Sequence, residues 1–123
     1  KEMLPHDQLT AMLTAADLFI CPSIYEPLGI VNLEAMGCET AVLGSRVGGI
    51  PEVVADKETG ELVDYNGEAA PFEKALTESI TRLMAQPDVL KKYGAAGRVR
   101  AQKLFGWDAV AALTVDLYRR VIA

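Results

Sequence analysis

Two glutamates, Glu26 and Glu34, bracket the one stretch of this sequence whose residue types and spacing suggest chemistry. Between them the chain passes Pro27 and Gly29 and enters a helical apolar pattern at Ile30. A glycine turn that leads into a helix presents free backbone N–H groups to an anion. Carboxylates beside such a site are poor ligands for phosphate, but they accept hydrogen bonds from hydroxyl groups on either side of it. The stretch therefore indicates a site for a phosphate flanked by hydroxyl groups.

The two glutamates also differ in what they could do for the fold alone. Glu34 could be a favourable charge near the positive end of the helix, which is worth about 0.3–1 kcal/mol. Glu26 lies before the helix and has no evident structural partner in the sequence. We therefore expect Glu26 in particular to have a functional role.

Three short strands are expected to position this stretch, at residues 18–21, 41–44 and 61–63. The first is wholly apolar, which is typical of a strand covered on both faces. Pro22 ends it because proline has no N–H to donate. After Gly29, apolar residues recur at helical spacing, so a helix follows the turn directly.

Helices fill most of the remaining chain. The first is expected from Asp7, as N-cap, to about residue 16. Apolar residues at four-residue spacing between 72 and 83 predict another, which Pro87 ends. A third begins at Asp88, and the last follows Gly106 as its N-cap. Strands alternating with helices predict an α/β fold, a partial Rossmann-like parallel sheet with flanking helices.

A second glycine motif, Gly48-Gly49, precedes a short helix expected from Pro51 to Val54. The two glycines could let this loop approach a ligand closely. They could equally form an ordinary turn between a strand and a helix. The sequence leaves both interpretations open.

Together these motifs resemble glycosyltransferase family 4, whose members are retaining enzymes of the GT-B fold that use nucleotide-sugar donors. The resemblance extends over residues 2–122, and PSIYEPLGIVNLE at residues 22–34 is most similar to bacterial glycogen synthases, the actinobacterial type in particular. The motifs that carry it are ADLFICPSIYEPLGIVNLEAM at residues 16–36, GGIPEVV at 48–54 and TG at 59–60.

The resemblance implies a role for each residue of the turn. Glu26 would be the catalytic residue and would hold hydroxyls of the donor sugar, while Glu34 would accept hydrogen bonds from the ribose. Backbone N–H groups at the helix start would hold the diphosphate, and backbone near Leu4 would touch the base. The implied donor-binding set is Leu4, Glu26, Pro27, Leu28, Gly29, Ile30, Val31 and Glu34. The donor, ADP-glucose or UDP-glucose, is a substrate, and neither a cofactor nor a metal is implied.

The function implied is the donor-binding part of a glycogen synthase-like enzyme that transfers glucose, with ADP-glucose as the favoured donor, to an α-glucan. One alternative keeps the family but changes the hexose or uses a small acceptor, and another is a non-catalytic nucleotide-binding or assembly module. In the family, an Arg and a Lys that neutralise the leaving diphosphate come from an earlier part of the C-terminal domain, and an N-terminal domain binds the acceptor. We therefore expect residues 1–123 to be a donor-binding domain incomplete at its N-terminal side and inactive by itself.

Composition and charge indicate which other binding partners to expect. The net charge is −5 and no cluster of basic residues is apparent, which argues against nucleic acid or an anionic membrane. No apolar run approaches the roughly 20 residues of a membrane span, so we expect a cytoplasmic protein, with Cys21 and Cys38 reduced. Self-association is also expected, through an unpaired sheet edge at residues 18–21 or 41–44 or through an apolar stripe on the last helix.

Overall fold

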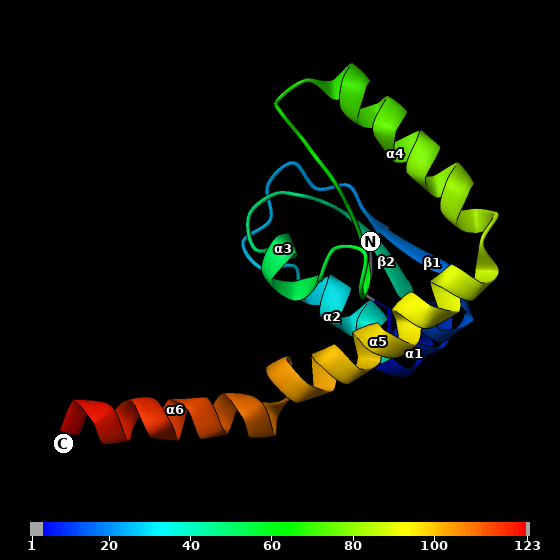
Figure 1. Ribbon diagram of the computed structural model, residues 1–123. Coiled ribbons are helices and arrows are strands. Elements are labelled where there is room, and N and C mark those ends of the chain that lie inside the picture. Colours follow the sequence, from blue (N-terminus) through cyan, green and yellow to red (C-terminus); the bar gives the residue numbers. More distant parts are fainter. Residues whose placement is uncertain (1–3, 123) are drawn as a thin grey trace.

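The computed structural model describes residues 4–122 (Figure 1). Short strands alternate with helices in the first half, and three long helices make up the second half, as the sequence pattern predicts. The elements are α1 (His6–Ala15), β1 (Leu18–Cys21), α2 (Ile30–Gly37), β2 (Ala41–Ser45), α3 (Ile50–Val53), β3 (Gly60–Val63), α4 (Ala69–Met84), α5 (Pro87–Phe105) and α6 (Trp107–Ile122).

The three strands form one parallel sheet in the order β1-β2-β3, which confirms the predicted α/β class. All five residues of β2 are buried because it pairs on both sides. The prediction that β1 is covered on both faces is wrong, since only Cys21 is buried and Ile20 is 36% exposed. Among the described residues β1 is an edge strand, and 41–44 is not an edge.

Two apolar clusters cover the faces of this sheet. Adjacent residues of a strand point to opposite faces, so Val42 packs into one cluster while Leu43 packs into the other. The first cluster joins β2 to α2 and α3, and the second joins it to α4. Helix α5 contributes to both, through Ala101 and Tyr93, and so holds the two layers together.

The starts of two helices depend on backbone groups. The N-cap of α1 is Pro5, whose carbonyl accepts a 3.0 Å hydrogen bond from Leu9, so the prediction that Asp7 is the cap is wrong. Asp7 lies in the first turn instead, where its charge still suits the helix dipole. Gly106 begins α6 as predicted, since its carbonyl accepts a 3.0 Å hydrogen bond from Val110.

Helix α6 extends away from the rest of the molecule (Figure 1) and has no buried residue. Along it, apolar side chains such as Leu113 and Leu117 are 67% and 58% exposed. Within residues 4–122 no helix is both long and apolar enough to cross a membrane.

Candidate functional site

Gly29 builds the turn that the sequence singles out. Its φ of 88° lies in the left-handed region, which residues with a side chain rarely adopt, and it is the N-cap of α2. Its carbonyl accepts a 2.9 Å hydrogen bond from the Asn32 N–H. The turn follows β1 at the carboxyl edge of the sheet, where ligands of open α/β folds bind.

Glu26 closes this turn on itself. Its Oε1 accepts a 3.0 Å hydrogen bond from the backbone N–H of Gly29. The expectation that Glu26 lacks a structural partner is therefore wrong. The same bond occupies one of the N–H groups expected to hold a diphosphate. The next two residues, Ile30 and Val31, are exposed in the first helical turn, where N–H groups have no partner within the helix.

The second glycine motif packs against the first turn. The Gly49 N–H donates to the Glu26 carbonyl at 3.0 Å. A Cβ at Gly49 would lie 2.6 Å from the Leu28 Cα, and one at Gly48, whose φ is 50°, would collide with the Glu26 carbonyl. These glycines are thus needed for contact between the loops that follow β1 and β2. The sequence interpretations, close approach to a ligand or an ordinary turn, did not include this contact.

Glu34 faces a different space from Glu26. It lines a cavity of about 260 Å³ between α1 and α2, together with residues of both helices. Leu4, expected near the base, is exposed and is not among the lining residues, whereas His6 is. Glu34 also lies beyond the first turn of α2, so a charge effect at the helix start does not explain it. Glu26 therefore lies at the α2 N-terminus, whereas Glu34 faces a separate cavity beside the C-terminal half of that helix.

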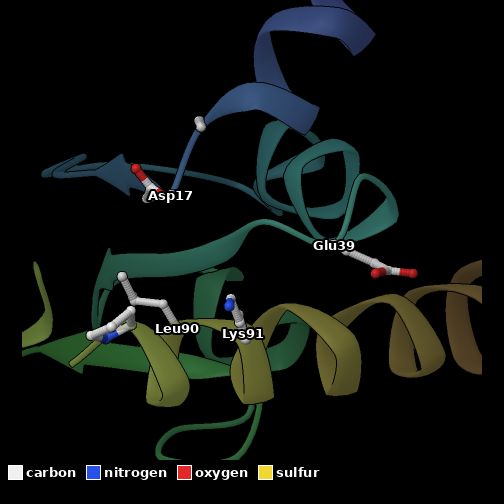
Figure 2. Close-up of a pocket in the computed structure, with 6 residues that line it drawn as sticks. Asp17, Glu39, Leu90 and Lys91 are labelled. Carbon is white, nitrogen blue, oxygen red and sulfur yellow. The ribbon is translucent and has the colours of Figure 1, made fainter.

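A smaller cavity, of about 110 Å³, lies at the opposite edge of the sheet (Figure 2). Asp17 and Glu39, which line it, precede β1 and β2 respectively, and Lys91 comes from α5. The three charged side chains come from separate segments, and Glu39 is ion-paired at 3.6 Å with Arg98, which does not line the cavity. Because ligands of this fold class bind at the carboxyl edge, we assign the function to the Glu26 side.

A buried carboxylate that the sequence did not single out lies on β3. Glu61 is 3% exposed and accepts hydrogen bonds from Arg82 at 2.5 and 3.1 Å, from Lys57 at 2.5 Å and from the Tyr93 hydroxyl at 3.3 Å. Burial alone would raise the pKa of Glu61, but the bonds from Arg82 and Lys57 outweigh it and lower that pKa. Burial, with Glu61 nearby, raises the pKa of Tyr93. We call these four residues the Glu61 cluster, and it joins β3 to α4 and α5.

The order of these parts matches a known family. The family model described as "Glycosyl transferases group 1" matches residues 2–100, which include the whole turn and both glycine motifs. The chain belongs to this family. Over 124 aligned positions it is 52% identical to the α-maltose-1-phosphate synthase of Mycolicibacterium smegmatis, covering all of this chain and 32% of that protein.

Solved structures agree with the family and with the fold. The sucrose-phosphate synthase of Thermosynechococcus elongatus matches with a TM-score of 0.84 and 38% identity, over 99% of this chain and 29% of that one. Anabaena HepE, solved with UDP and glucose, matches with a TM-score of 0.70 and 22% identity, over 87% of this chain and 29% of that one. At that identity HepE supports the fold alone.

These comparisons support a coarser assignment than the sequence motifs suggested. The fold is that of a C-terminal GT-B glycosyltransferase domain. The narrower resemblance to glycogen synthases is not supported, since the relatives above are named for sugar-phosphate products. The chain spans between about a quarter and a third of the length of the curated relatives it matches.

Proposed function

We propose that this chain is the donor-binding part of a retaining glycosyltransferase that moves glucose from a nucleotide-glucose to a phosphorylated sugar. The observation that carries the proposal is the order of Glu26, the α2 N-terminus and Glu34 along the chain, with Glu26 in the turn and Glu34 in a cavity beside α2. A nucleotide-sugar has hydroxyl groups on both sides of its diphosphate, so it matches a carboxylate, a helix N-terminus and a second carboxylate in that order.

Each part then has a separate task. The N–H groups of Ile30 and Val31, at the positive end of α2, would stabilise the charge that develops on the leaving diphosphate. Glu34 would hold the ribose in the cavity between α1 and α2. Glu26 would hold the sugar hydroxyls beside the reacting carbon, which places it closest to the chemistry.

The names of two relatives support the acceptor class. α-Maltose-1-phosphate synthase and sucrose-phosphate synthase are both named for phosphorylated disaccharides. A transferase that makes such a product from a nucleotide-sugar must add a sugar to a phosphorylated monosaccharide. An α-glucan acceptor is the second candidate, which rests on the likeness of residues 22–34 to glycogen synthases.

Glucosyl transfer by the full-length protein that contains this chain tests the proposal. ADP-glucose and UDP-glucose are each offered with glucose 1-phosphate or with glycogen, and the released nucleotide and the sugar product are measured. We expect a disaccharide phosphate, with ADP-glucose the better donor. Glycogen extension without a disaccharide phosphate would favour the second candidate, and nucleotide binding without any transfer would favour a non-catalytic module. We expect no transfer from the isolated chain, because the resemblance places an Arg, a Lys and the acceptor domain outside it.

The Glu26→Ala variant of the full-length protein tests the role of that residue. We expect kcat/KM for the donor to fall at least about 100-fold, since contacts at the reacting sugar count most in the transition state. Glu73→Ala, at an exposed position on α4, is the matched control and should change kcat/KM less than about twofold. Near-normal turnover by Glu26→Ala would rule out the assigned role.

A further inference from the structure

Asn32 has an unusual environment for a polar side chain. It is 0% exposed, yet neither its amide oxygen nor its amide nitrogen has a hydrogen-bond partner among the described residues. Buried polar groups in folded proteins nearly always have partners, because an unpaired one loses its bonds to water without replacement. An unpaired buried amide such as that of Asn32 therefore calls for an explanation.

Its position indicates which partner it could take. Asn32 is the third residue of α2, and Gly29 is the N-cap. In capping boxes the side chain at this helix position reaches back to the backbone N–H of the N-cap residue. Here the amide nitrogen of Asn32 lies 2.5 Å from where a Cβ of residue 29 would be, so the amide is packed directly against Gly29. Rotation about its terminal bond would present the amide oxygen on that side instead.

The Gly29 N–H is, however, already bonded to Oε1 of Glu26. The Glu26 carboxylate and the Asn32 amide therefore both lie against Gly29. Only the first is bonded to it in this structure. The proposed function requires Glu26 to accept hydrogen bonds from the donor sugar.

We propose that Asn32 is a positioning residue that takes over the Gly29 N–H when the Glu26 carboxylate turns to the sugar. This inference rests on the proposed function. In the exchange, the turn loses one hydrogen bond and gains another, so α2 stays capped while Glu26 is released. Asn32 gains a partner only in the donor-bound state, which favours that state over the free one. The glycine at position 29 is needed for the same reason, since any side chain there would displace the amide.

A stability cycle tests the exchange without any need for turnover. In the wild-type background, Asn32→Leu replaces an unpartnered amide with an apolar group of the same branched shape, so we expect the melting temperature to stay level or rise. In a Glu26→Ala background the Gly29 N–H is open to Asn32, so the same change should lower the melting temperature by several degrees. The reversal of sign is the signature of two acceptors sharing one donor. Equal effects in both backgrounds would overturn the proposal.

Kinetics of the full-length protein give the second measurement. We expect Asn32→Leu to lower kcat/KM for the nucleotide-glucose about tenfold while inhibition by the free nucleoside diphosphate changes less than about twofold. In the Glu26→Ala background the further loss should be below about twofold, because the exchange is already absent. Asn66→Leu, at the other asparagine of the chain, is the control and should leave kcat/KM unchanged.

Each outcome separates the two hypotheses. Losses that multiply in the double variant would show that Glu26 keeps the Gly29 N–H while it binds the sugar, and Asn32 would then support the fold alone. Normal turnover by Glu26→Ala would reject the proposed function, and the stability cycle would still show whether the two side chains share the N–H. Asn32→Ala replaces Asn32→Leu in both cycles if the leucine does not fit.

Discussion

Glu61 and Glu26 are carboxylates held in different ways at two regions of one small sheet. Glu61 is almost fully buried, and its two carboxylate oxygens accept hydrogen bonds from three side chains. These lie in the loop before β3, on α4 and on α5. Glu26 is half-buried, and among the described residues its carboxylate accepts one hydrogen bond, from the backbone of its own turn. A group with many fixed partners cannot leave them without a large loss of stability. A group with one local partner can exchange it, which is what a ligand site requires.

Of the variants that test this difference between the two regions, Gly49→Ala in the full-length protein should have the largest effect on activity. The new Cβ meets the backbone of Pro27 and Leu28 and must displace the turn that contains them. We expect kcat/KM to fall at least about 100-fold, because small displacements at a reacting centre have effects of that size. Lys74→Ala, at an exposed position on α4, is the control. Equal kinetics for the two variants would show that the contact between the loops does not shape the site.

Arg82→Ala should lower the stability of the protein and leave its activity unchanged. Among the described residues, it leaves the buried Glu61 carboxylate with Lys57 as its only cationic partner. We expect the free energy of unfolding to drop by about 1–3 kcal/mol, measured by urea denaturation, with the donor KM unchanged. The exposed pair of Arg119 and Asp116 supplies the control, and Arg119→Ala should cost less than about 0.5 kcal/mol. A changed donor KM in Arg82→Ala would mean that the two regions are coupled.

Glu34→Ala should have a moderate effect that separates the two glutamates of the site. Ribose contacts are made equally before and during the reaction, so their loss raises KM without lowering kcat. We expect the donor KM to rise about tenfold with kcat within about twofold. Initial rates over a range of donor concentrations decide this, and a fall in kcat would place Glu34 nearer the chemistry.

Acid should affect the Glu61 cluster in a defined direction. Because the folded state lowers the pKa of Glu61, its contribution to stability is present above the unfolded value of about 4.3 and is lost as the pH falls through the folded value. Below about pH 4.3 the wild type should therefore lose more stability than Glu61→Gln does. Denaturation curves at pH 7 and in steps below pH 5 measure the difference. Parallel losses in both proteins would remove Glu61 from the acid response.

The smallest effect on either region should come from α6, which lies outside both. We expect the isolated chain to self-associate through the exposed apolar side chains of this helix. Leu117→Glu should reduce that association, as seen by sedimentation over a concentration series, without changing nucleotide binding. A monomer at every concentration in the wild type would refute the association.

The sequence predicts the local parts of this molecule and misses the parts that need distant partners. The turn at Gly29 follows from residue types within a few positions, and so do the strand and helix limits near it. The Glu61 cluster does not, since Arg82 and Tyr93 are 21 and 32 positions away from Glu61 and reach it only through the packing of α4 and α5. The exposure of Ile20 depends on the order of strands, which apolar patterns do not contain.

That strand order has a consequence for how the chain folds. Because β1, β2 and β3 pair in the order in which they occur in the chain, each new strand adds to the free side of the one before it. No strand has to insert between two that are already paired, and each link spans a short loop and one helix. The sheet can thus grow one strand at a time as the polypeptide leaves the ribosome, because each strand pairs with a neighbour that has already emerged. The β2 backbone amides that point toward β1 should then gain protection from hydrogen exchange before those that point toward β3.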